Sequence, residues 1–167
     1  PQNSTHRITR LILPIALERG MHISIVIGPG YLHHQDLHRF LDGVPAEHVK
    51  LANGTKRISE YMARADLAFS SAGRTVFELA AMRVPGIIIA SNSREEVHTF
   101  AREENGMRFL GRSDTASDEE IVDAFRLLLD SPEARRALRT KTERWDFGSG
   151  RQRVLGAMKA LLEQKQD

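Results

Sequence analysis

The sequence predicts an α/β fold in which a parallel β-sheet is covered by helices on both faces. Short apolar runs rich in β-branched residues alternate with helical segments along the chain. Single helices of about 10–15 residues separate successive strands, which is typical of parallel sheets built from crossover connections. Such connections are almost always right-handed, so we expect a doubly wound, Rossmann-like sheet.

The predicted strands are bounded by turn residues. The clearest is GIIIA at residues 86–90, which follows Pro85 and is apolar throughout. The other strands are expected at residues 22–27, 49–52, 67–70 and 107–110.

The predicted helices begin at recognisable caps. The first follows a cap among residues 3–5 and ends before Gly20. Ser117 and Glu120 have the spacing of a capping box, and Pro132 suits the first turn of a helix. After the first helix, we expect helices at residues 35–41, 58–65, 75–82, 95–104, 118–129, 132–145 and 151–164.

Composition places the chain among ordinary globular proteins and excludes several kinds of site. Of its 167 residues, 41% are hydrophobic and 28% charged, with 24 Lys and Arg against 22 Asp and Glu. A net charge of +2 spread along the chain indicates no nucleic-acid partner. The absence of cysteine excludes disulfides, thiol catalysis and cysteine-bound metal, and it is compatible with a cytoplasmic location.

No segment predicts membrane insertion or secretion. No apolar run approaches the roughly 20 residues that a membrane-spanning helix needs. The first residues, PQNSTH, lack the basic start and apolar stretch of a signal peptide. Because the chain begins with Pro1 rather than Met, we expect it to be a piece of a longer protein.

The segment ADLAFSSAGRTVFE at residues 65–78 combines a strand, a turn of small residues and a helix start. Ligands of doubly wound sheets bind beyond the carboxyl ends of the strands, where this turn lies. Its small residues, Ala72 among them, let a ligand approach, and Gly73 can adopt backbone angles closed to other residues. The helix start attracts an anion, Ser71 and Thr75 add hydroxyl donors, and Arg74 adds positive charge.

Glu78 lies one turn into the same helix. A carboxylate there can accept hydrogen bonds from both hydroxyls of a ribose, so diphosphate and ribose together make a coherent nucleotide site. Alternatively, the small residues only allow a tight turn, and Glu78 reflects the preference for acids near helix starts. The spacing by itself does not decide between these two interpretations, because short glycine motifs are weakly specific.

Two further loops at the same predicted edge carry polar residues. The loop after the GIIIA strand opens a helix, where Asn92 and Ser93 can either bond sugar hydroxyls or cap the helix, and Arg94 can meet a phosphate. In the loop after the second predicted strand, the backbone near Arg57 and Ile58 can contact a base, although a solvated turn is the simpler interpretation.

The histidines give no metal site. His34 and His38 are four residues apart on one helix face, a spacing that can bind zinc, but no acidic partner follows the HExxH pattern. We predict no metal and no cofactor, and the residues identify no catalytic group.

The stretch ADLAFSSAGRTVFELAAMRVPGIII resembles the nucleotide-binding stretch in the C-terminal half of GT-B glycosyltransferases. It is similar to the N-acetylglucosaminyltransferases that make lipid II. It is more similar to the UDP-sugar hydrolases of pseudaminic acid biosynthesis and their spore-coat polysaccharide relatives. Counterparts there extend to the Asn92 loop, the ENG sequence at residues 104–106 and the pattern Gly148-x-Gly150-x-x-Arg153-Val154.

This resemblance covers nearly the whole chain and implies a role for each predicted site residue. The relatives usually carry an Asn-Gln or Gln-Gln pair at the sugar loop, so the Asn92-Ser93 pair implies different sugar contacts. By position, Ser71, Ala72, Gly73 and Thr75 line the diphosphate, Glu78 binds the ribose, Arg57 and Ile58 flank the uracil through their backbone, and Asn92 and Ser93 face the donor sugar.

The resemblance also implies a domain layout. Residues 1–147 form the UDP-sugar-binding domain, and residues 148–167 form a C-terminal helix that packs on it or on a missing N-terminal half. The family's first strand, which lies mid-sheet, is absent, and the exposed sheet edges favour a homodimer. In the hydrolase relatives the catalytic histidine belongs to the N-terminal half. We therefore expect this chain alone to bind nucleotide weakly and to catalyse nothing.

Three functions remain open for the parent protein. The first is a UDP-sugar hydrolase or glycosyltransferase in surface-polysaccharide or nonulosonic-acid biosynthesis. The second is a non-catalytic binding or assembly module fused to another sugar-nucleotide enzyme. The third is a UDP-sugar 2-epimerase, which shares the GT-B architecture.

Overall fold

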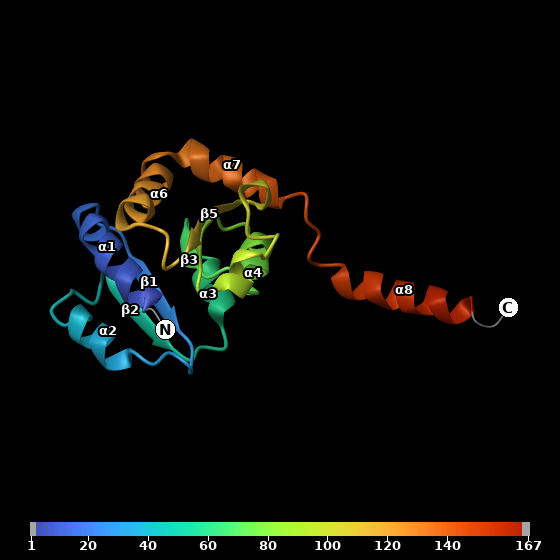
Figure 1. The fold of residues 1–167 in the computed structure, drawn as a ribbon, viewed down its shortest axis with the longest axis horizontal. Helices are drawn as coiled ribbons and strands as arrows, with labels where there is room; N and C mark the ends of the chain where they lie inside the picture. The colour runs from blue at the N-terminus through green and yellow to red at the C-terminus, as the bar shows by residue number, and fades with distance from the viewer. Residues whose placement is uncertain (1–2, 165–167) are drawn as a thin grey trace.

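A computed structural model describes residues 3–164 and confirms the predicted alternation of strands and helices (Figure 1). Each predicted strand is present, with its ends within two residues of their expected positions. In chain order the elements are α1 (Ser4–Glu18), β1 (Ile23–Ile27), α2 (His34–Leu41), β2 (Val49–Asn53), α3 (Ile58–Met62), β3 (Ala68–Ser70), α4 (Thr75–Ala81), β4 (Gly86–Ala90), α5 (Ser93–Glu96), the 3₁₀-helix η1 (Glu103–Asn105), β5 (Met107–Arg112), α6 (Asp118–Asp130), α7 (Pro132–Thr142) and α8 (Gly150–Glu163).

All strand pairs are parallel, as predicted, but the strands form two sheets rather than one. β1 pairs with β2, and β4 lies between β3 and β5. Within the described part of the chain, β1 and β3 each have one edge without a strand partner. That a further strand of a longer protein lies between the two sheets stays a prediction.

β4 is the centre of the fold because all five of its residues are buried. Its successive side chains point to opposite faces. Ile87 belongs to a cluster with apolar residues of α1, α6 and α7, whereas Ile88 belongs to a cluster with apolar residues of α3 and α4. Helices therefore lie on both faces of this sheet, as a doubly wound fold requires (Figure 1).

The prediction of a single helix over residues 95–104 is wrong. α5 ends at Glu96, and the chain turns before it enters η1. The Arg102 side chain donates to the Glu96 carbonyl over 2.9 Å, which satisfies an acceptor that a longer helix would have used. The turn also brings the Phe100 ring centroid to 4.5 Å from that of Phe77 and 5.5 Å from that of Trp145. Aromatic packing thus replaces the expected helical bonds.

The C-terminal helix α8 stands apart from the other elements, and Figure 1 shows it extending away from them. None of its residues is buried. Packing of this helix on the domain is therefore not observed, and its packing on an N-terminal half stays a prediction. Among the helices described, none has the length and apolar character needed to cross a membrane.

Candidate functional site

The candidate site lies where β3, β4 and β5 end. Because the strands are parallel, their carboxyl ends meet at one edge of the sheet. The register pairs Ser70 with Ile88 and Ala90 with Arg112, so the loops that follow these strands are neighbours. The N–H of Ser113 extends this contact, since it donates to the Ala90 carbonyl over 2.9 Å.

The turn after β3 is anchored by Ala72, which is fully buried in the same cluster as Ile88. Gly73 does not adopt the left-handed conformation that glycine allows, so the turn does not use this freedom. A Cβ at Gly73 would lie 3.6 Å from the Ser71 hydroxyl and 3.7 Å from Glu95 Oε1, both ordinary contacts. The fold itself therefore tolerates a side chain at Gly73, and glycine there leaves the turn accessible from outside.

The start of α4 carries no side-chain cap. Arg74 precedes it in helical conformation, so the helical turn already begins in the glycine turn. Within residues 3–164, the N–H groups of Gly73, Arg74 and Thr75 have no hydrogen-bond acceptor. By contrast, side chains cap the helices α5, α6 and α7. Unpaired N–H groups at a helix start form a site that favours an anion.

Glu78 is exposed and lies in the first turn of α4, as predicted. In the described part of the chain, no side chain forms a hydrogen bond or ion pair with its carboxylate. The carboxylate is therefore available to accept hydrogen bonds from hydroxyl groups.

The start of α5 is not the second anion site that the sequence allowed. Asn92 Oδ1 accepts the N–H of Glu95 over 3.0 Å, and Glu95 Oε2 accepts the N–H of Ser91 over 2.8 Å. The helix has only four residues. Asn92 is thus a helix cap, which is one of its two predicted roles, while Ser93 and Arg94 are exposed beside it.

The predicted uracil contacts lie at the start of α3. The Arg57 N–H donates to Thr55 Oγ1 over 3.0 Å, and its guanidinium pairs with Glu60 over 3.0 Å. The Arg57 N–H is therefore occupied. The side chain of Ile58 packs against the cluster that contains Ala72, which connects the start of α3 to the glycine turn.

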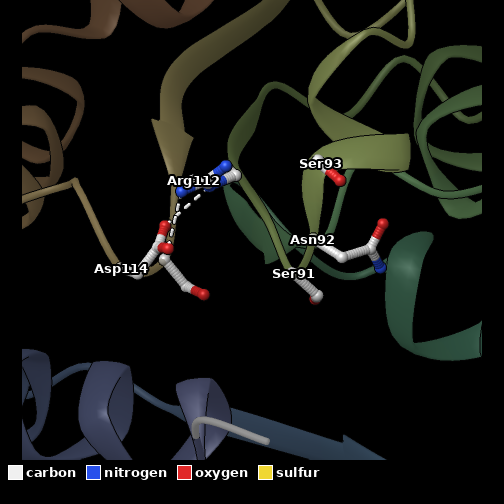
Figure 2. Close-up of a pocket in the computed structure, with 6 residues that line it drawn as sticks. Ser91, Asn92, Ser93, Arg112 and Asp114 are labelled. Carbon is white, nitrogen blue, oxygen red and sulfur yellow. Dashed lines mark hydrogen bonds and ion pairs between the residues drawn. The ribbon is translucent and has the colours of Figure 1, made fainter.

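A pocket of about 310 Å³ opens between the loops after β4 and β5 (Figure 2). A second pocket of about 380 Å³ adjoins it at the start of α1 and shares Ser113 and Asp114 with the first. The first is lined by Ser91, Asn92, Ser93, Arg112, Ser113 and Asp114. The second is lined by Asn3, Arg7, Ser113, Asp114 and Ala116.

Arg112 and Asp114 form a two-pronged ion pair in the first pocket (Figure 2). Arg112 Nε lies 2.7 Å from Asp114 Oδ1, and Nη2 lies 2.7 Å from Oδ2. These hydrogen bonds hold the pKa of Asp114 below its usual range and raise the pKa of Arg112. The third guanidinium nitrogen, Nη1, lies 3.7 Å from Glu96 Oε2.

Arg7 on α1 holds the loop after β5 in place. Its Nη1 donates to the Ser113 carbonyl and its Nη2 to the Ala116 carbonyl, each over 2.7 Å. Its Nε reaches Asp118 Oδ1 at 2.6 Å. One side chain thus satisfies two loop carbonyls and the first residue of α6.

The loop after β5 is absent from the predicted site, because the sequence pattern places the end of β5 at residue 110, two residues too early. The rule that ligands gather beyond the carboxyl ends of strands could have found it. The predicted residues of the glycine turn and of the Asn92 loop lie together, joined by Glu95. No histidine lines either of the two pockets.

Comparison with known proteins places the chain in a family. The profile of the glycosyltransferase family 28 C-terminal domain matches residues 8–147. The chain is also 26% identical over 165 residues to the UDP-N-acetylglucosamine–N-acetylmuramyl-(pentapeptide) pyrophosphoryl-undecaprenol N-acetylglucosamine transferase of Carboxydothermus hydrogenoformans. That alignment covers 96% of this chain and 44% of the relative.

Two solved structures share the fold at 16% identity. One, from Listeria monocytogenes, is assigned as a UDP-N-acetylglucosamine 2-epimerase and has a TM-score of 0.71 over 97% of this chain and 42% of that chain. The other, MurG of Acinetobacter baumannii, has a TM-score of 0.64 over 92% and 46%. The chain therefore spans less than half the length of these relatives.

The predicted GT-B half is confirmed, whereas the closer resemblance to pseudaminic acid hydrolases stays a prediction. By the match over residues 8–147, the chain belongs to the glycosyltransferase family 28 C-terminal domain family.

Proposed function

We propose that this chain is the UDP-sugar-binding half of a glycosyltransferase or nucleotide-sugar hydrolase. The observation that carries the proposal is the family match over residues 8–147, since the family supplies the nucleotide-sugar-binding module of glycosyltransferases. The relative from Carboxydothermus hydrogenoformans is, by its name, a transferase that uses UDP-N-acetylglucosamine, which supports UDP as the nucleotide.

Three features of the chain support the binding scheme. The unpaired N–H groups at the start of α4 suit the diphosphate, with Ser71 and Thr75 beside them. The free carboxylate of Glu78 suits the ribose hydroxyls. The position of Ile58 against the core cluster suits a uracil close to the glycine turn.

In the proposed whole enzyme, water or an acceptor hydroxyl attacks the anomeric carbon of the donor sugar. The bond from that carbon to the diphosphate oxygen breaks, and UDP leaves. Negative charge grows on the diphosphate during this step, and the start of α4 stabilises that charge. The base that activates the nucleophile is not assigned to this chain.

The test is calorimetry of UDP binding to the wild-type chain and to Glu78→Ala. Loss of charge-assisted hydrogen bonds to the ribose should weaken UDP binding by about tenfold or more. Binding of 2′,3′-dideoxy-UDP should be equal in the two proteins, because that nucleotide lacks the two hydroxyls. The control is Glu119→Ala, which removes an exposed first-turn acid from α6. Unchanged UDP affinity in Glu78→Ala would contradict the ribose assignment.

The remaining alternatives have less support. A likeness to the assigned 2-epimerase at 16% identity shows the fold alone. The activity of the parent protein would distinguish a non-catalytic module from an enzyme of surface-polysaccharide or nonulosonic-acid biosynthesis. A cytoplasmic location, an N-terminal half as partner and homodimer formation also stay predictions.

A further inference from the structure

The pocket between the loops after β4 and β5 is lined only by residues with polar or charged side chains. Its six residues offer hydroxyl, amide, guanidinium and carboxylate groups, and none of them is aliphatic or aromatic. Pockets for apolar ligands are lined mainly by hydrophobic side chains. A lining that offers both hydrogen-bond donors and acceptors instead suits a ligand that carries several hydroxyl groups.

The charges in the pocket argue against a second phosphate as its occupant. Arg112 is the one cation among the lining residues, and its guanidinium is shared between Asp114 and Glu96. Two carboxylates around one guanidinium leave no surplus positive charge. A phosphate would have to displace Asp114 from Arg112, whereas a neutral sugar would leave that pair intact.

Asp114 retains room to accept further hydrogen bonds. An ionised carboxylate has about four acceptor positions. Arg112 occupies one position on each oxygen, and the Asp114 side chain remains 47% exposed. On each oxygen, the side away from Arg112 can still accept a hydrogen bond from a ligand hydroxyl.

The pocket adjoins the proposed diphosphate site through Glu95. Glu95 Oε2 accepts the N–H of Ser91, which lines the pocket, while Oε1 lies 3.7 Å from where a Cβ on Gly73 would be. A ligand with its diphosphate at the start of α4 therefore has the pocket next to its far end.

The opposite wall of the pocket is held rigidly. Arg7 binds the Ser113 and Ala116 carbonyls, and the capping box of Ser117 and Glu120 fixes the chain where α6 begins. In Figure 2, Arg112 and Asp114 lie across the pocket from Ser91, Asn92 and Ser93. Such supported side chains suit selective recognition, because little ordering is needed when a ligand binds.

We infer that Asp114, oriented by Arg112, is a specificity-determining residue that accepts hydrogen bonds from the donor-sugar hydroxyls in this pocket. The inference rests on the proposed function, since it assumes that a nucleotide sugar occupies the start of α4. Arg112 acts as a positioning residue, because it fixes the carboxylate and does not itself need to contact the sugar.

The experiment compares UDP with UDP-N-acetylglucosamine, UDP-N-acetylgalactosamine and UDP-glucose by calorimetry, for the wild type and Asp114→Ala. For the UDP-sugar that the wild type binds most tightly, Asp114→Ala should raise Kd by about tenfold. The Kd of UDP should change less than about twofold. The conservative variant Asp114→Asn, which keeps one acceptor oxygen, should lose less affinity than Asp114→Ala.

The matched control is Asp130→Ala, which removes a carboxylate from a similarly exposed ion pair with Arg19 outside the pocket. This variant should change neither the Kd of UDP nor the Kd of the UDP-sugar. Equal losses for UDP and UDP-sugar in Asp114→Ala, or no loss for either, would overturn the sugar assignment while leaving the nucleotide site standing. Failure of the wild type to bind UDP would instead overturn the proposed function, and this inference with it.

Discussion

At Gly73 the backbone lies outside the left-handed region, and a Cβ would make only ordinary contacts with Ser71 and Glu95. Neither backbone strain nor internal packing therefore requires glycine at this position. Within residues 3–164, the N–H groups of the next two residues have no hydrogen-bond acceptor. This residue thus provides a way to separate the binding role of the turn from its structural role.

The variant Gly73→Ala should keep the fold and lose nucleotide binding. Replacing glycine where the backbone is compatible commonly stabilises a protein by about 0.4–1 kcal/mol, so the thermal midpoint should be unchanged or slightly higher. The added methyl group should keep the diphosphate from the backbone and weaken UDP binding by about tenfold. Calorimetry and thermal unfolding measure the two effects.

A suitable control is Gly156→Ala in α8, where a Cβ would have no neighbour within 4 Å. It should leave UDP affinity unchanged. If Gly73→Ala binds UDP as well as the wild type does, the glycine turn serves the fold alone, and the diphosphate assignment is wrong.

Among the short elements, η1 connects β5 and α7 through one carboxylate. Glu103 on η1 pairs with Arg108 on β5 over 3.1 Å and with Lys141 on α7 over 3.2 Å. Hydrogen bonding and charge attraction from Lys141, then from Arg108, hold the pKa of Glu103 below its usual range. Because the pKa is lower in the folded state, this stabilisation is present above the unfolded pKa and is lost as pH falls through the folded pKa.

Glu103→Gln should therefore lower the urea midpoint at pH 7, and the difference from wild type should shrink as pH falls below about 4.3. The measurement is urea unfolding between pH 7 and pH 3. A constant difference for Glu103→Gln would show that its ion pairs do not stabilise the fold.

Elements defined by local signals were predicted well from the sequence. The apolar run of β4 and the capping box at Ser117 and Glu120 both appear where expected. The segment after α5 could not be predicted, because its turn depends on Phe100 packing against Phe77 and Trp145, far apart in sequence. The Arg7 contacts with the loop after β5 are likewise more than 100 residues apart, so no local pattern reveals that wall of the candidate site.

The molecule as a whole consists of a packed α/β body and the separate helix α8 (Figure 1). Near the end of the body, a hydrogen bond holds Trp145 in place. Its Nε1 donates to Asn105 Oδ1 over 3.1 Å. Phe147 follows, with its ring centroid 6.1 Å from that of Phe100. Beyond these aromatic residues, α8 contributes no buried side chain to the body.

Removal of residues 148–167 should leave the stability of the body nearly unchanged. Changes at exposed positions typically alter stability by less than about 0.5 kcal/mol, which corresponds to about 2 °C in Tm for a chain of this size. Removal of residues 143–167 also deletes Trp145 and Phe147, which are 43% and 36% exposed, and should destabilise the body by about 2 kcal/mol. Thermal unfolding of the two truncated chains tests this division. A large loss of stability in the shorter deletion would show that α8 packs on the body.

The central claim is that the start of α4 binds the diphosphate of a UDP-sugar. Its most direct test is a titration of the ¹⁵N-labelled chain with UDP, followed by amide chemical shifts. The account predicts saturable shifts at Gly73, Arg74 and Thr75, whose N–H groups have no acceptor within residues 3–164. The absence of shifts, or shifts confined to α6 and α8, would contradict it.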